Sequence, residues 1–190
     1  MKIKLVVLIC AIATNSLAAT KMFYVYNDKG TKESVKFAPS GWMGDYGDLK
    51  LNDGETEGCI DGRTCIKWTY NAKGAQGANW AGAFWQNPPN NWGTRPGGYD
   101  LSAFKKLTFW AKSPNGARIA EFKVGGITGE FGDSDAESLG PVELTKEWKK
   151  YTIDLSGKNL AHIIGGFCFS ASRDDNPNGY TLFLDEIRFE

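Results

Sequence analysis

The sequence predicts an all-β protein, an antiparallel β-sandwich of the jelly-roll type. Three observations support this fold class. Apolar and polar residues alternate with a period of two in several segments, clusters of turn residues separate those segments, and no window keeps a helical period for more than about two turns. The chain is also rich in turn formers, with 23 glycines and 7 prolines among 190 residues. This length allows one domain with a substantial core.

The clearest predicted strand covers residues 66–70, where Ile66, Trp68 and Tyr70 share one face and two polar residues share the other. Successive side chains of a strand point to opposite faces, so this pattern indicates a half-buried strand. The glycine-rich segment 39–48 is expected to be a loop. Strands are expected at residues 22–26, 49–51, 66–70, 80–85, 107–112, 121–124, 151–155, 166–171 and 180–188. The expected sandwich core contains Trp68, Tyr70, Phe109, Phe122, Ile153, Phe167 and Phe183.

The first nineteen residues have the pattern of a cleaved secretory signal. Two lysines precede an apolar run over residues 5–13, and Leu17-Ala18-Ala19 supplies the small residues of a cleavage site. The apolar run is too short to span a bilayer comfortably, which makes a membrane anchor the weaker interpretation. We therefore expect a signal peptide at 1–19 and a single β-sandwich domain at 20–190, in a protein secreted to the periplasm or outside the cell.

The net charge and the single histidine exclude several classes of function. The chain carries 22 basic and 22 acidic residues, so it has no strong field to hold nucleic acid or an anionic membrane. The one histidine, His162, lies in the apolar stretch 160–164 and is interpreted as structural rather than as a general base. Neither a G-x-S-x-G elbow nor a phosphate-binding G-x-x-x-x-G-K-[ST] loop occurs.

The cysteines predict one disulfide in the secreted protein. Cys59 and Cys65 flank a short turn-like stretch, and in an oxidising compartment they would close a small loop. A metal site is the weaker interpretation, because two thiols without a nearby histidine or further cysteine cannot complete a tetrahedron. Cys168, among apolar residues, is expected to be a buried and inert thiol.

Aromatic residues are the most informative part of the composition, with 7 Trp, 7 Tyr and 11 Phe. A sugar ring has apolar C–H faces that stack on flat side chains, so exposed aromatic rings beside polar groups indicate a carbohydrate-binding surface. By their position in the predicted strands, Trp85 and Trp110 are expected to point away from the core as platforms, with Glu121 as a partner for sugar hydroxyls. The loop residues expected to contact the ligand are Trp42, Tyr46 and Trp92.

Three stretches carry a family resemblance: 39–48 (PSGWMGDYGD), 80–93 (WAGAFWQNPPNNWG) and the closing strand 180–190. They resemble a group of secreted bacterial jelly-roll modules similar to carbohydrate-binding modules with a galactose-binding-like fold. The resemblance implies glycan binding on a concave sheet face or at loop ends. It also implies a structural calcium, at positions that match Asp28 and Asp185 here.

A second calcium interpretation is weaker. Asp174, Asn176 and Asn178 match the start of a calcium loop that would end at Asp185, but residues 180–185 are expected to form a strand that cannot wrap around an ion. A plain β-turn is the preferred interpretation of this segment.

The function expected from the sequence is non-catalytic recognition of a polysaccharide or cell-surface glycan. One alternative is a small glycan-cleaving enzyme, a hydrolase or lyase, on the same fold. Glycoside hydrolysis needs only two carboxylates at a set separation, and Glu121, Asp133, Asp135 and Glu137 are candidates. A further alternative is an adhesive module whose aromatic surface binds another protein.

Overall fold

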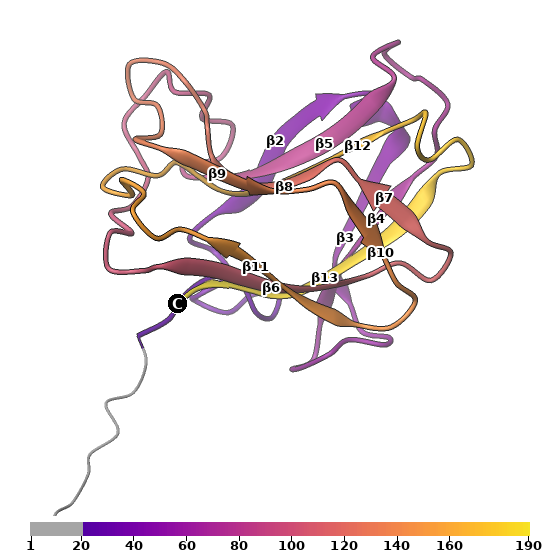
Figure 1. The fold of residues 1–190 in the computed structure, drawn as a ribbon, viewed down its shortest axis with the longest axis horizontal. Coiled ribbons are helices and arrows are strands. Elements are labelled where there is room, and N and C mark those ends of the chain that lie inside the picture. The colour runs from indigo at the N-terminus through magenta and orange to yellow at the C-terminus, as the bar shows by residue number, and fades with distance from the viewer. Residues whose placement is uncertain (1–20) are drawn as a thin grey trace, which may run out of the picture.

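Two antiparallel sheets face each other in the computed structural model, which describes residues 21–190 (Figure 1). The predicted signal peptide lies outside the described residues. The elements are β1 (Phe23–Tyr26), β2 (Ala38–Gly44), the 3-10 helix η1 (Tyr46–Asp48), β3 (Leu49–Glu55), β4 (Cys65–Tyr70), β5 (Trp80–Gln86), β6 (Lys106–Lys112), β7 (Ala117–Ile119), β8 (Glu121–Gly125), β9 (Ala136–Leu139), β10 (Val142–Leu144), β11 (Lys149–Asp154), β12 (Gly165–Ser172) and β13 (Tyr180–Phe189). Residues 21–190 contain no α-helix, which confirms the predicted all-β class.

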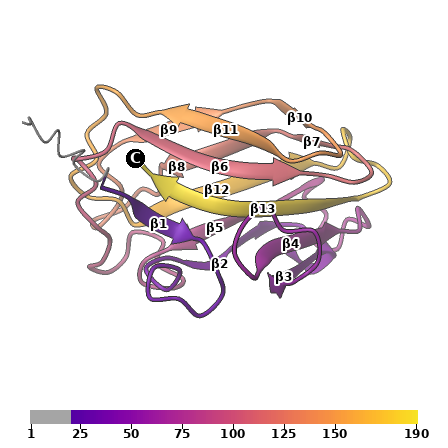
Figure 2. The same ribbon diagram turned by 90° about the horizontal axis from the view of Figure 1, so that it is seen from below.

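The strands are divided between a six-stranded and a five-stranded sheet. The six-stranded sheet has the order β11-β6-β13-β4-β3, with β1 paired to β13 beside this path. The five-stranded sheet has the order β2-β5-β12-β8-β9, and β7 and β10 form a separate pair. Figure 2 looks towards the six-stranded sheet, where β6 and the yellow β13 lie side by side. The nine predicted strands are all present, with some of their ends displaced.

The core between the sheets is built from aromatic rings. Phe109 of the six-stranded sheet lies with its ring centroid 4.6 Å from that of Phe122 and 5.1 Å from that of Phe167, both on the five-stranded sheet. Trp68 is fully buried and packs its ring edge to face on Phe169 at 5.4 Å. Such pairs add specific contacts to the burial of large apolar surfaces. The predicted core residues Trp68, Tyr70, Phe109, Phe122, Ile153 and Phe167 all belong to this cluster.

Phe183 is the exception among the predicted core residues. It is buried, but it lies outside the central cluster. Its ring packs against Trp148 at 6.3 Å, and the Nζ atoms of Lys112 and Lys67 lie 5.0 and 5.5 Å from the ring centre. The stems of these lysines and the Trp148 ring shield Phe183 on the outer face of the six-stranded sheet. The prediction that Phe183 is buried is therefore confirmed, but its assignment to the core between the two sheets was wrong.

The segment predicted as a glycine-rich loop is an edge strand. β2 pairs along β5, with a bulge between Pro39 and Gly41. Glycine usually weakens a strand, which is why the sequence pattern favoured a loop. Here glycine is required by close packing, because a Cβ atom at Gly41 would lie 2.8 Å from the Cβ of Phe84. The expectation of a loop over residues 39–48 was therefore wrong for residues 39–44, which belong to β2.

Candidate functional site

The outer face of the five-stranded sheet carries Trp80, the most exposed aromatic residue on any strand within residues 21–190. In β5, Ala81, Ala83 and Trp85 point into the core, so the alternate residues Trp80 and Phe84 point outwards. Trp80 exposes 39% of its surface, whereas Phe84 is buried at the base of this face. Strand alternation thus produces one aromatic ring at the start of β5 and another near its end, both on the outer side of the sheet.

Gly82 and Ser170 provide small residues at the centre of this face, with Met43 and Glu121 on either side of them. The cross-strand register places Met43, Gly82, Ser170 and Glu121 in one row across β2, β5, β12 and β8. Gly82 is required by close packing, because a Cβ atom there would lie 2.4 Å from the carbonyl oxygen of Phe169. Gly82 and Ser170 add little side-chain volume to the outer surface at this point, between the larger rings of Trp80 and Phe84.

The next row across the sheet is Phe84, Cys168 and Lys123. Cys168 is buried there, and burial raises the pKa of its thiol well above the usual value. A thiol held in its neutral form is a poor nucleophile, in agreement with the predicted inert role.

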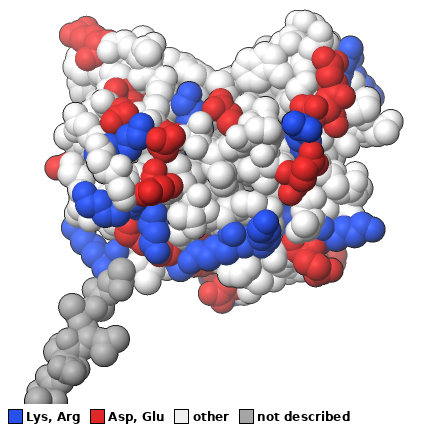
Figure 3. Space-filling view, in the orientation of Figure 1, with Lys and Arg blue, Asp and Glu red and all other residues white. Residues whose placement is uncertain are grey.

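Loops rise above the sheet on both sides of these rows and form what we call the concave face. Segments 87–98 and 126–135 rise at one end of the strands and segment 71–79 rises at the other (Figure 1). Figure 3 shows the surface hollowed between these two groups of loops. The concave face is therefore the outer side of the five-stranded sheet, bounded by these three segments.

Trp92 lies on the first of these walls. It exposes 40% of its surface and packs edge to face on Phe84, with 6.0 Å between ring centroids. The adjacent Gly93 accepts a hydrogen bond from the backbone N–H of Phe131, at 3.0 Å, which joins segment 87–98 to segment 126–135. The predicted exposure of Trp92 is confirmed, and its neighbours place it at the rim of the concave face.

Two buried carboxylates hold the opposite wall. Asp45 accepts backbone N–H bonds from Gln76, Ala78 and Asn79 at 2.8–2.9 Å. These bonds, that from Ala78 most of all, lower the pKa of Asp45. Asp48 likewise accepts from the N–H groups of residues 74 and 75. Segment 71–79 is thereby fixed beside Trp80.

Tyr46, which was predicted as a loop contact, lies in η1 next to this wall. It exposes 51% of its surface, and the following backbone N–H, of Gly47, bonds to the Gln76 side chain at 2.9 Å. Tyr46 is therefore exposed beside segment 71–79, and its contact with a ligand stays a prediction.

Trp85 is not a platform, and this prediction was wrong. It exposes 1% of its surface and packs on Phe167 and Trp68, with ring centroids 5.3 and 6.0 Å away. The sequence analysis placed the Trp85 face of β5 towards solvent, whereas this face points into the core. The pattern is ambiguous because β5 carries aromatic residues on both of its faces. Trp80 and Phe84, which share the other face, are the residues that the sequence reasoning missed.

Two other predicted rings lie away from the concave face. The indole N–H of Trp42 donates to the Pro39 carbonyl at 2.9 Å, and its ring packs on Trp68 at 5.0 Å, so Trp42 covers the edge of the core. Trp110 points outwards as expected but belongs to β6 of the six-stranded sheet, whereas Glu121 belongs to the five-stranded sheet. The structure therefore separates the predicted partners Trp110 and Glu121 on opposite outer faces.

The candidate catalytic carboxylates have structural partners. Asp133 accepts backbone N–H bonds from Ile127 and Ile164 through different oxygens, and burial raises its pKa. Asp135 and Glu137 both pair with Lys158, at 3.6 and 2.9 Å. Of the four candidates, only Glu121 has no side-chain hydrogen bond or ion pair to another residue within 21–190. A glycosidase needs two available carboxylates, so this arrangement does not favour hydrolysis.

The predicted disulfide is confirmed, with an S–S distance of 2.16 Å between Cys59 and Cys65. The two predicted calcium ligands hold the loop that it closes. Asp28 accepts N–H bonds from Arg63 and Thr64 at 2.8 and 2.7 Å. Asp185 accepts longer ones, of 3.2 and 3.4 Å, from residues 60 and 61, and burial raises its pKa to about 7.

These contacts do not fit a shared calcium ion. Calcium requires six to eight oxygen ligands, whereas the loop turns N–H donors towards both carboxylates. Within residues 21–190, three metal-binding side chains come together only at Cys59, Cys65 and Asp185, and the two cysteines are joined to each other. Asp28 and Asp185 act here as anchors of the disulfide loop, and calcium binding stays a prediction of the resemblance.

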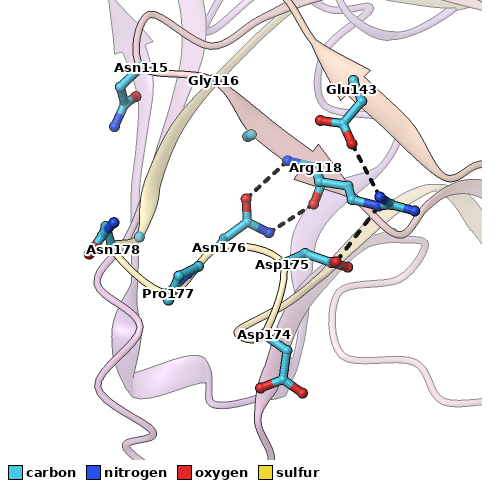
Figure 4. Close-up of a pocket in the computed structure, with 11 residues that line it drawn as sticks. Asn115, Gly116, Arg118, Glu143, Asp174, Asp175, Asn176, Pro177 and Asn178 are labelled. Carbon is cyan, nitrogen blue, oxygen red and sulfur yellow. Dashed lines mark hydrogen bonds and ion pairs between the residues drawn. The ribbon is translucent and has the colours of Figure 1, made fainter.

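A polar cavity of about 630 Å³ lies at one end of the sandwich (Figure 4). Arg118 forms ion pairs with Glu143 at 3.4 Å and with Asp175 at 3.8 Å. The amide of Asn176 accepts from the Arg118 N–H and donates to its carbonyl, which fixes the cavity wall. None of its lining residues is aromatic. With its cation already paired and no ring for stacking, this cavity is a weaker candidate than the concave face.

The fold is similar to that of solved carbohydrate-binding modules. A family 30 module of the cellulase CEL9D-CEL44B of Clostridium thermocellum has 15% identity and a TM-score of 0.58, covering 90% of this chain and 97% of that chain. The family 11 module of Lic26A-Cel5E from the same organism has 14% identity and a TM-score of 0.52, covering 90% and 95%. The family 29 module CBM29_1 of Piromyces equi has 13% identity and a TM-score of 0.50, covering 89% of each chain.

These similarities confirm the predicted resemblance at the level of the fold. No protein-family model matches the sequence, and no curated protein sequence matches it. Among residues 21–190, no helix has the length and apolar character needed to cross a membrane.

Proposed function

We propose that this protein is a secreted, non-catalytic carbohydrate-binding protein that holds a polysaccharide or cell-surface glycan on its concave face. One observation carries the proposal: Trp80 and Trp92 are the most exposed tryptophans within residues 21–190, and they lie at opposite ends of the outer face of β5, Trp80 at its start and Trp92 against Phe84. The surface is hollowed between the flanking loops (Figure 3). Aromatic rings at the rim of a hollow provide the flat apolar surfaces on which sugar rings stack. The fold similarity to carbohydrate-binding modules supports the same function.

The dimensions and polarity of the face suit a glycan chain. Phe84, whose ring contacts Trp92, lies four residues after Trp80 in β5. Four residues correspond to about 13 Å along a strand. In the row between them, Ser170 offers a hydroxyl group and Glu121 a carboxylate, and in the row of Phe84, Lys123 offers an ammonium group. One acidic and one basic side chain balance each other, so we expect an uncharged polysaccharide to be preferred over a strongly anionic one.

The experiment is affinity electrophoresis of the chain from residue 20 on a panel of polysaccharides. Soluble β-glucans come first, because two of the similar solved modules belong to cellulases. We expect one glycan class to retard the wild type, Trp92→Ala to lose this retardation, and Trp110→Ala, a ring on the opposite sheet, to keep it. A folded wild type that no glycan retards would contradict the proposal and favour a protein-binding surface.

Secretion and the galactose-binding-like assignment belong to the same proposal. The disulfide is consistent with an oxidising compartment. N-terminal sequencing of the exported protein tests cleavage after residue 19, and an uncleaved chain would overturn the signal peptide.

A further inference from the structure

His162 joins the two segments that form one wall of the concave face. It is the chain's one histidine and lies in the connection between β11 and β12. Its Nδ1 atom lies 2.8 Å from the carbonyl oxygen of Gly132, and its Nε2 atom lies 2.8 Å from the carbonyl oxygen of Gly97. The imidazole ring therefore bridges segment 126–135 and segment 87–98.

The two contacts of the ring can both be hydrogen bonds in only one of its protonation states. A carbonyl oxygen only accepts hydrogen bonds, whereas a neutral imidazole carries a single N–H. With a carbonyl oxygen at hydrogen-bond distance from each ring nitrogen, both contacts are hydrogen bonds at the same time only when both nitrogens donate, as in the imidazolium form. Loss of one proton would set a nitrogen lone pair against a carbonyl oxygen at one of the two ends.

The two segments that the ring bridges each contribute one charged side chain near it, one acidic and one basic. Asp133, from segment 126–135, interacts with His162 electrostatically, and the charge of the histidine opposes the rise that burial causes in the pKa of Asp133. On the other segment, the guanidinium of Arg95 is bonded to the Pro89 carbonyl. The backbone of His162 is anchored to Ser134: its carbonyl accepts the Ser134 N–H at 2.8 Å, and its N–H donates to the Ser134 hydroxyl at 3.1 Å.

The bridge acts on the wall that presents Trp92. Gly97 lies five residues after Trp92 in the same segment. Among residues 21–190, the only other hydrogen bond that joins the two segments near Trp92 is the one from the Phe131 N–H to the Gly93 carbonyl. A wall held at two points is more rigid than one held at a single point, and a ring fixed before binding costs less entropy when a ligand arrives.

We propose that His162, in its imidazolium form, is a positioning residue that holds Trp92 at the rim of the concave face, so that glycan binding is stronger at mildly acidic than at alkaline pH. The glycan part rests on the proposed function. The positioning part concerns the free protein and stands or falls without a ligand.

The first test needs no glycan and uses the fact that the chain has a single imidazole. At pH 5.5, the ¹⁵N spectrum of the histidine side chain is expected to show two protonated ring nitrogens. Hydrogen exchange of the amides of residues 92–95, 97 and 129–132, corrected for the intrinsic effect of pH, is expected to show weaker protection at pH 8.5 than at pH 5.5. A neutral ring at pH 5.5, or equal protection at both pH values, would overturn the proposal.

The second test compares the wild type with His162→Gln, which is uncharged at every pH. The probe is the polysaccharide that retards the wild type in electrophoresis, or mixed-linkage β-glucan as the first choice. We expect wild-type affinity to fall about tenfold from pH 5.5 to pH 8.5, as for one lost hydrogen bond to a charged donor, and the variant to vary much less. The same decline in both proteins would overturn the role of His162.

Failure of the two proposals can be told apart. If no glycan binds at either pH while the ring is doubly protonated and the exchange depends on pH, the positioning role stands and the glycan function fails. If His162→Gln does not fold, the spectrum and exchange of the wild type still decide the positioning role.

Discussion

Replacing Trp85 by alanine is expected to lower the stability of the protein strongly. Trp85 exposes 1% of its surface and packs on two other core rings. Burial of about 200 Å² of tryptophan surface at about 25 cal/mol per Å² contributes about 5 kcal/mol. Measured substitutions of buried aromatic residues by alanine cost about 3–5 kcal/mol. An existing cavity of about 230 Å³ also borders Trp85, and the substitution would enlarge it.

We therefore expect Trp85→Ala to reduce the free energy of unfolding by about 4 kcal/mol, measured by urea denaturation. For a domain of this size, the melting temperature would fall by about 8–16 °C. Trp92→Ala is the matched control, because it removes the same side chain from an exposed position that has one edge-to-face contact, with Phe84. Its expected cost is about 1 kcal/mol. Equal effects of the two substitutions would refute the assignment of Trp85 to the core.

Three further predictions concern the loop and the C-terminal strand. Replacing Cys59 and Cys65 by serine is expected to lower the free energy of unfolding by about 2 kcal/mol in urea, and an unchanged midpoint would contradict this. Because Asp28 and Asp185 face N–H donors, EDTA is expected to leave the melting temperature unchanged, and a decrease would show that the loop binds a metal ion. Burial alone would raise the pKa of Glu190, but bonds from Lys106, Thr108 and Arg188 lower it to about 2. The ionised Glu190 carboxylate thus stabilises the folded protein fully above about pH 4.5, and this contribution is lost as the pH falls through 2. The melting temperature of Glu190→Gln should therefore decrease less at acidic pH than that of the wild type.

The strand pattern could be predicted from the sequence because alternation is local. It correctly placed Trp80 and Phe84 on one side of β5 and Trp85 on the other. Which side faces the core depends on the partner sheet, and β5 carries large rings at the ends of both faces. Ala81 and Ala83, which share the Trp85 face, were the available signal, because small residues in series leave room for rings from the opposing sheet.

Features that depend on distant contacts could not be predicted in the same way. Segment 71–79 forms a wall because Asp45 bonds to backbone groups more than thirty residues away. His162 was correctly interpreted as structural, but its carbonyl partners lie 30 and 65 residues away in the chain. The exposure of Trp92 was predicted from its polar loop, whereas its position above Phe84 follows only from the fold.

Isothermal titration calorimetry with the polysaccharide that retards the wild type tests the glycan-binding function most directly. Wild type, Trp92→Ala and Trp110→Ala are compared, after thermal unfolding has shown that all three are folded. If the concave face is the binding site, Trp92→Ala weakens binding at least about tenfold, or about 1.4 kcal/mol, and Trp110→Ala leaves it unchanged. Full affinity in Trp92→Ala combined with lost affinity in Trp110→Ala would move the site to the opposite sheet and contradict the account.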